Sequence, residues 1–80
     1  MQQAKGIVVS VNESLVGVKT THGAVMNGEV ANIVIEDGKR LKSEVIDVKS
    51  GQLVYLQVFE DTNWMKAGDL VEFSGVNWFQ

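Results

Sequence analysis

Short runs of alternating hydrophobic and polar residues cover most of this chain. Six of them are rich in Val, Ile, Leu and aromatic residues: 6–11, 15–20, 29–36, 41–49, 53–59 and 69–73. A repeat of two is typical of a β-strand, in which successive side chains point to opposite faces. In the first run it places Ile7, Val9 and Val11 on one face. Residues 60–67 are interpreted as a loop, and no segment predicts a convincing helix.

Turn-forming residues separate these runs at intervals of about 8–12 residues, the spacing of a small antiparallel barrel or sandwich. Asp37-Gly38 is the strongest hairpin signal, because glycine adopts the positive φ that the turn needs; Ser50-Gly51 predicts another hairpin. So short a chain has few other ways to protect strand edges. We therefore expect an all-β fold, a small closed six-stranded antiparallel Greek-key β-barrel over residues 1–76. Residues 77–80 are assigned to a C-terminal tail, either truncated or non-native.

Composition narrows the class of protein. The 80 residues include no cysteine, so disulfides and thiolate metal sites are excluded, and the net charge is −3. This weakly acidic balance counts against a dedicated nucleic-acid binder. Basic residues concentrate in the first half and are interpreted as solvated turn and edge charges: Lys5, Lys19, Lys39, Arg40 and Lys42. No apolar run approaches the ~20 residues of a membrane helix, and the first residues do not form a secretory signal. These patterns predict a cytoplasmic location without direct membrane insertion.

Residues suited to catalysis are few. His22, the only histidine, lies in a predicted turn and is interpreted as an exposed turn residue. Gly38-Lys39 does not extend to a phosphate-binding loop, whose first glycine should stand five positions before Gly38. Glu60 and Asp61 predict solvation and turn capping at a strand end, with Asp61 able to accept backbone N–H groups of the following loop. We therefore predict no catalytic residue, no cofactor-binding residue and no metal ligand in this chain.

The aromatic residues fall into two groups. Three lie in the strand runs and are expected to pack in the core or between strands: Tyr55, Phe59 and Phe73. The others lie in a loop or near residue 80, and large aromatics in such places often mark contact surfaces. The predicted interface residues are Trp64, Met65, Trp78 and Phe79. For Trp64, covering its own end of the barrel is an equal alternative to meeting a partner.

Five segments, in order, resemble one known family. They are KGIV (5–8), NGEVANI (27–33), SEVIDV (43–48), LQVFEDT (56–62) and MKAGDLVEFSG (65–75). The last two carry the most specific pattern, Q-V-F-E-x-T followed by G-x-x-V-x-F-x-G. The chain resembles the N-terminal β-barrel domain of rotary ATPases, in particular that of the catalytic A subunit (alpha chain) of bacterial V/A-type ATP synthases. The family tends to place glycine where Trp64 stands, so Trp64→Gly is expected to cost packing or association and to leave the fold intact.

This resemblance implies a mechanical function. Such barrels form a ring, or crown, at the membrane-distal end of an alternating A/B hexamer, and each joins its neighbours side by side. The implied partners are the B-subunit barrel and neighbouring A-subunit barrels, in an ATP-driven or ATP-producing ion-translocating complex. The chain would be the N-terminal fragment of a larger, peripheral subunit, with ATP and Mg²⁺ bound by a later domain.

Two other functions stay open. One is a free-standing OB-like β-barrel that binds nucleic acid or another ligand. That function needs a basic face with stacking aromatics, and the aromatic residues here are not interleaved with Lys or Arg. The other is an enzyme acting alone, for which the sequence assembles no catalytic residues.

Overall fold

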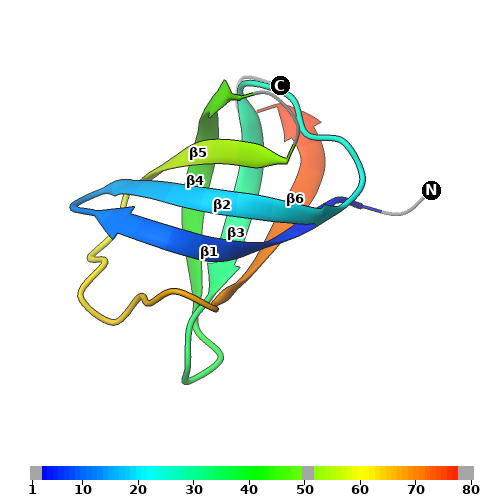
Figure 1. Cartoon of the computed structure of the whole chain (residues 1–80). Coiled ribbons are helices and arrows are strands. Elements are labelled where there is room, and N and C mark those ends of the chain that lie inside the picture. Colours follow the sequence, from blue (N-terminus) through cyan, green and yellow to red (C-terminus); the bar gives the residue numbers. More distant parts are fainter. Residues whose placement is uncertain (1–2, 50–51, 78–80) are drawn as a thin grey trace.

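Six strands, one from each predicted run, form the fold. In the computed structural model, which describes residues 3–49 and 52–77, they close into an antiparallel barrel (Figure 1). The strands are β1 (Lys5–Asn12), β2 (Leu15–His22), β3 (Glu29–Val34), β4 (Arg40–Val48), β5 (Leu53–Val58) and β6 (Leu70–Asn77). The described residues contain no helix. The predicted fold class is confirmed.

The strand order around the barrel is β1-β2-β5-β4-β3-β6, and β6 pairs with β1 to close it. Strands β3, β4 and β5 pair consecutively, and β6 returns to pair with β3. This order, three consecutive strands with a fourth beside the first, is a Greek key. Closure pairs every strand on both sides, so the barrel satisfies the backbone groups that an open sheet would leave at its edges.

The core consists of the inward-facing residues of each strand. On β2 these include Val16 and Val18, and on β3 Ala31 and Ile33, as the alternation predicted. Among the described residues, Phe73 on β6 is the largest fully buried side chain. The predicted Asp37-Gly38 turn is also confirmed, with Gly38 at a φ of 86°. The Ser50-Gly51 turn lies outside the described residues.

The prediction for β1 was wrong in one respect, because the strand contains a β-bulge. Its register with β2 shifts between Val8 and Ser10, so Val9 has no residue opposite it. Beyond the bulge Val11 pairs with buried Val16, and paired residues lie on the same face of a sheet. Ile7 and Val9 therefore face outward, whereas Val11 belongs to the inner face near the barrel end. Alternation alone could not reveal the extra residue.

Two strands extend beyond their predicted ends. β2 continues through His22, where a turn was predicted. β6 continues to Asn77, four residues beyond the predicted run 69–73. Gly75 has a φ of 77° and lies where the register between β3 and β6 shifts, so it forms a bulge within the strand. The assignment of residues 1–76 to the barrel domain stays a prediction, although the strand passes its boundary by one residue.

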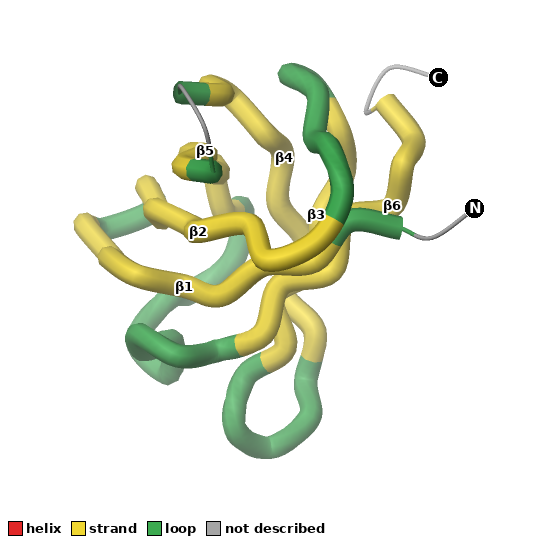
Figure 2. Tube along the Cα trace, turned by 45° about the vertical axis from the view of Figure 1, so that its right-hand side comes forward, coloured by secondary structure: helices red, strands yellow, loops and turns green. Residues whose placement is uncertain are grey.

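The loops gather at the two ends of the barrel (green in Figure 2). One end carries the β1–β2 turn, the β3–β4 turn and the loop 59–69; we call it the Trp64 end. The opposite end carries the loop 23–28, the start of β3 and the ends of β4 and β6; we call it the Glu29 end. The two ends and the wall between them are the surfaces available to a partner.

Candidate interaction surface

The loop 59–69, which carries Trp64, is fixed by hydrogen bonds at both ends. Asp61 Oδ1 accepts the backbone N–H of Asn63 at 2.9 Å, which confirms the turn-capping role predicted for that acid. Thr62 Oγ1 donates to the carbonyl oxygen of Glu13 at 2.9 Å, which ties the loop to the β1–β2 turn. Near its end, Asp69 Oδ2 accepts the N–H of Lys66 at 2.9 Å. The loop thus holds its tryptophan on an ordered backbone.

Trp64 is 75% exposed, more than any other large hydrophobic residue of the described chain. Among described residues other than glycine, only Glu13 has a positive φ. A tryptophan here therefore needs no left-handed backbone, and it stands without strain at the position where the resemblance led us to expect glycine. The indole lines a pocket of about 430 Å³ together with Ile35, Glu36, Asp37 and Lys39.

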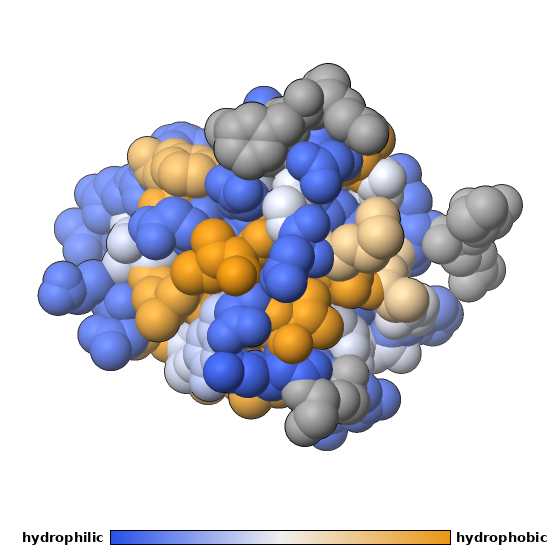
Figure 3. Space-filling model, turned by 90° about the horizontal axis from the view of Figure 1, so that it is seen from above, coloured by the Kyte–Doolittle hydropathy of each residue, from blue (hydrophilic) through white to orange (hydrophobic). Residues whose placement is uncertain are grey.

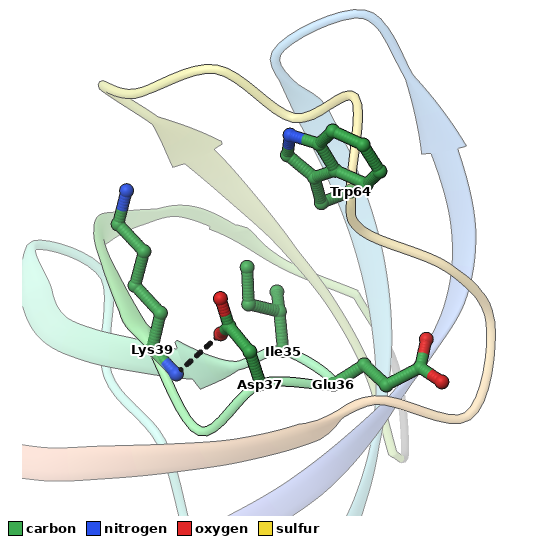
Figure 4. A pocket seen from close by; sticks show the side chains of 5 residues that line it. All are labelled: Ile35, Glu36, Asp37, Lys39 and Trp64. Atoms are coloured by element: carbon green, nitrogen blue, oxygen red, sulfur yellow. Dashed lines mark hydrogen bonds between the residues drawn. The ribbon is translucent and has the colours of Figure 1, made fainter.

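Figure 4 shows how these side chains lie. Trp64 approaches from the loop, Ile35 stands opposite it, and the three charged residues lie along the β3–β4 turn. Asp37 Oδ1 accepts the backbone N–H of Lys39 at 2.8 Å, so this carboxylate shapes the turn. The lining is apolar in the middle, at Trp64 and Ile35, and carries charges of both signs around it.

An ion pair joins the two segments that form the pocket. Lys66 Nζ donates to Glu36 Oε2 at 2.7 Å. This hydrogen bond and the attraction between the charges lower the pKa of Glu36 and raise the pKa of Lys66. Because the pKa of Glu36 is lowered, its contribution to stability is present above the ordinary value of 4.5 and is lost as pH falls below it. Because the pKa of Lys66 is raised, its contribution is present below 10.5 and is lost as pH rises above it. Both groups are exposed, so water and salt weaken the pair.

The other predicted interface residues differ in whether the structure describes them and how far it exposes them. Met65 is 7% exposed and belongs to the core, so it offers little area to a partner. Its side chain points inward while that of its neighbour Trp64 points outward. Trp78 and Phe79 lie outside the described residues. Of the predicted set, Trp64 is the residue that the structure exposes.

The aromatic strand residues also differ from one another. Phe73 is fully buried and Tyr55 half-buried, as expected. Phe59 is 53% exposed, so of the two expected positions the core is excluded. The reason is that β5 ends at Val58, which places Phe59 at the start of the loop.

Candidate catalytic residues do not come together. His22 lies exposed at the end of β2, at the Glu29 end of the barrel. Glu60 lies near the opposite end, where its Oε2 accepts the backbone N–H of Lys42 at 3.2 Å. Within residues 3–49 and 52–77, no group of three or more His, Asp or Glu side chains could hold a metal ion. The same residues contain no helix of the length and apolarity needed to cross a membrane.

One apolar feature of the wall was not predicted. Val34 pairs with Leu70, and Leu70 pairs with Ile7, so the three form a row across β3, β6 and β1. Leu70 is 42% exposed and Ile7 39%, with Val34 half-buried. Sequence alternation could identify each residue as outward-facing, but only the order of the strands brings them together.

Glu29 was also missed as a structural residue. Its side chain is buried, and its two carboxylate oxygens accept backbone N–H groups from Met26 at 3.1 Å and from Gly75 at 2.8 Å. The Gly-Glu pair at the start of β3, part of the segment NGEVANI, was the available sequence signal.

Comparison with known proteins identifies the family. Residues 2–75 match the model of the ATP synthase alpha/beta family, beta-barrel domain. The chain belongs to this family.

Relatives of this beta-barrel domain include three bacterial V-type ATP synthase alpha chains. Identity is 43% over 75 residues with the protein of Treponema denticola and 45% over 75 residues with that of Treponema pallidum. It is 47% over 70 residues with the protein of Borreliella afzelii. The alignments cover 94%, 94% and 88% of this chain but 12% of each relative. The chain thus spans about one eighth of the length of these relatives.

The family pattern has a structural meaning in this barrel. Gln57 Nε2 donates to Ser14 Oγ at 2.7 Å, and the N–H of Val58 donates to the carbonyl oxygen of Ser14 at 2.9 Å. Together with the Thr62 bond to Glu13, these contacts fasten the end of β5 to the β1–β2 turn. The residues of the Q-V-F-E-x-T motif therefore help to close the Trp64 end of the barrel.

Proposed function

We propose that this chain is the N-terminal crown barrel of a V/A-type ATP synthase catalytic A subunit. In this function the barrel is non-catalytic and holds an alternating A/B hexamer together by side-to-side contacts with neighbouring barrels. The observation that carries the proposal is the match of nearly the whole chain both to the family's barrel domain and to V-type alpha chains. The wider complex would be a rotary, ion-translocating ATPase with this subunit on its cytoplasmic, peripheral side, and ATP and Mg²⁺ would bind in a later domain.

The fold supports a mechanical role. A closed barrel pairs every strand on both sides, so its wall resists deformation better than an open sheet. The apolar features of its outer surface include the wall row of Val34, Leu70 and Ile7 and the exposed ring of Trp64. Both are small beside the roughly 800 Å² per partner of a typical stable interface. They suit contacts that several subunits make together in a ring.

The charges agree less well with nucleic-acid binding. Arg40 is paired with Glu72, Lys49 with Asp47 and Lys66 with Glu36. Basic side chains that already pair with carboxylates gain less binding free energy from a nucleic-acid phosphate. The net charge of −3 also repels the negatively charged nucleic acid.

Sedimentation velocity tests the contact directly. The chain is run alone and with the barrel domain of the B subunit, each at high concentration. We expect association with the B barrel, weakened at least threefold by Leu70→Lys and by Trp64→Ala. Ile46→Lys is the matched control, because Ile46 is 45% exposed and lies near the end of β4, outside the wall row and away from the Trp64 end. Absence of association at the highest concentration contradicts the proposal.

Two further observations separate the alternatives. The gene should encode a phosphate loop after residue 80, and a stop codon at that point would contradict the assignment to a catalytic subunit. A salt-dependent spectral shift on adding single-stranded DNA would instead support a nucleic-acid-binding barrel.

A further inference from the structure

The pocket beside Trp64 lies between two segments that hydrogen bonds hold in place. Its volume of about 430 Å³ falls within the roughly 300–1,000 Å³ of typical ligand pockets. In the β3–β4 turn, the N–H of Ile35 donates to the carbonyl oxygen of Lys39 at 3.0 Å. The loop that carries Trp64 is fixed by the hydrogen bonds described above, and the ion pair between Lys66 and Glu36 joins it to the turn. The walls of the pocket are therefore ordered before a partner arrives, which lowers the entropic cost of binding.

The middle of this pocket offers an aromatic face. Trp64 is 75% exposed, whereas Ile35 is 6% exposed and belongs to the core. In Figure 4 the indole lies across the pocket from Ile35, and no other side chain drawn there covers the ring. The π face of an indole attracts cations, and the planar guanidinium group of arginine stacks on such rings. The exposed ring of Trp64 is therefore suited to an arginine side chain of a partner.

Two carboxylates stand beside this aromatic face. Asp37 Oδ1 accepts the backbone N–H of Lys39, and Glu36 Oε2 accepts from Lys66. Within the described part of the chain, the second oxygens of these carboxylates, Asp37 Oδ2 and Glu36 Oε1, accept no hydrogen bond. The lining holds these two carboxylates and one ammonium group, that of Lys39, so its net charge is −1. A guanidinium group stacked on Trp64 has further N–H groups to donate to a carboxylate, and such charge-assisted bonds are strong.

Charge is distributed unevenly over the barrel. The three loops of the Trp64 end, residues 13–14, 35–39 and 59–69, carry six acidic and two basic residues. The rest of the chain carries four acidic and five basic residues. The opposite side, where β4 and β6 end, shows hydrophobic residues among hydrophilic ones (Figure 3). The excess of negative charge thus lies at the Trp64 end, where it attracts a basic partner toward the pocket.

We propose that the pocket beside Trp64 receives an arginine side chain from a basic segment of a neighbouring subunit. The guanidinium group stacks on the indole and donates to Asp37 and Glu36 at the rim. An acidic segment would meet an excess of carboxylates, and an apolar side chain would leave the rim carboxylates without a partner. The inference deepens the function proposed above and rests on it for the source of the segment.

Titration with a model peptide tests this recognition. The probe is acetyl-Gly-Arg-Gly-Arg-Gly-amide, and its counterpart carries citrulline, a neutral side chain of nearly the same shape, in place of both arginines. NMR spectra of the 80-residue chain at low salt follow the amide signals of residues 35–39 and 59–69. We expect the arginine peptide to bind at least fivefold more tightly than the citrulline peptide. Its affinity should fall as salt is added, because salt screens the carboxylates.

A pair of double variants tests the role of the rim carboxylates. Glu36→Gln combined with Asp37→Asn should weaken binding of the arginine peptide at least threefold, and asparagine keeps an oxygen that can accept the turn hydrogen bond. The matched control is Glu44→Gln combined with Asp47→Asn. It also removes two negative charges and one ion pair, that of Asp47 with Lys49, but on β4. We expect the control to bind the peptide with nearly unchanged affinity.

Two single variants test the aromatic face and the charge of the lining. Trp64→Ala should weaken binding of the arginine peptide at least fivefold, because the stacking surface is lost. Lys39→Gln should tighten binding at least twofold, because it removes a positive charge from the lining. A contact that depended only on apolar area would not respond to Lys39→Gln.

Competition tests the source of the segment. In the sedimentation experiment described above, an excess of the arginine peptide should weaken association with the B barrel at least threefold, and the citrulline peptide should not. Association that the arginine peptide leaves unchanged would contradict the assignment of the segment to a neighbouring subunit.

Three results overturn the recognition itself. They are equal affinities for the arginine and citrulline peptides, unchanged binding by Trp64→Ala, and equal losses in the two double variants. If the chain still associates with the B barrel, any of these results removes this inference alone and leaves the proposed function standing. Peptide binding without any association with the B barrel removes the proposed function and leaves the preference of the pocket for arginine.

Discussion

Trp64 illustrates how a residue can be prominent in a loop and contribute little to folding. Three quarters of its surface is exposed, and its backbone needs no positive φ. Trp64→Gly removes few internal contacts. It increases the conformational entropy of the unfolded chain, which lowers the free energy of unfolding by about 0.5–1 kcal/mol. We expect urea unfolding followed by circular dichroism to show a loss of no more than about 1 kcal/mol. Phe73→Ala, in the core, should cost about 3–5 kcal/mol, and complete unfolding of Trp64→Gly would contradict the exposed position.

Glu29 has the opposite character, since it is buried and bonded on both oxygens. Glu29→Ala leaves the N–H groups of Met26 and Gly75 without their acceptors, and a lost buried acceptor typically costs about 1–3 kcal/mol. We expect that decrease in the free energy of unfolding, measured by urea titration at pH 7. Glu36→Ala, at an exposed site, should leave the free energy of unfolding nearly unchanged. Similar small effects of both changes would show that Glu29 is not a structural anchor.

At the scale of elements, bulges decide which faces the strands present. Val9 is the extra residue in β1, so deleting it restores regular alternation: Val8 and Val11 keep the inner face and Ser10 keeps the outer. We expect the deletion variant to fold and unfold cooperatively, with reduced stability, because the local bend of the strand is lost. Heteronuclear NMR spectra and urea titration would show this.

Deletion of Asn32 is the matched comparison. β3 pairs with β4 in regular register around this position, and Ala31 and Ile33 both face the core. After the deletion these two residues are adjacent, so one of them must face outward. A shift of one residue moves every later inward side chain to the other face. This variant should show no cooperative transition. Equal tolerance of both deletions would mean that the bulge does not set the register.

At the scale of the whole molecule, closure depends on contacts between distant parts of the chain. Ile7 pairs with Leu70, so the barrel closes only when the first and last strands meet. Folds dominated by such long-range pairing refold in about milliseconds to seconds. The chain contains no proline, so slow prolyl isomerisation over tens of seconds is excluded. We expect stopped-flow circular dichroism to show refolding without a phase of tens of seconds; such a phase would point to another slow step.

The candidate surface was only partly visible in the sequence. Trp64 could be singled out because a large ring in a polar loop is unusual, and the structure exposes it. Its neighbour Met65 could not be separated from it, because a loop has no regular period that predicts which side chains turn inward. The wall row depends on the order of the strands around the barrel, which leaves no periodic signal in the sequence.

The sequence by itself determined the strands, the antiparallel all-β class and the family, because alternation, turn residues and motifs are local. It also placed Ala31, Ile33 and Phe73 correctly, since regular alternation persists along their parts of the strands. Only the tertiary structure decided which strands are neighbours, where bulges reverse the alternation and why Glu29 is buried. These features arise when distant segments meet: the carboxylate of Glu29 accepts the N–H of Gly75 in β6, 46 residues further along the chain. That dependence on long-range contact is the physical reason why local patterns could not reveal them.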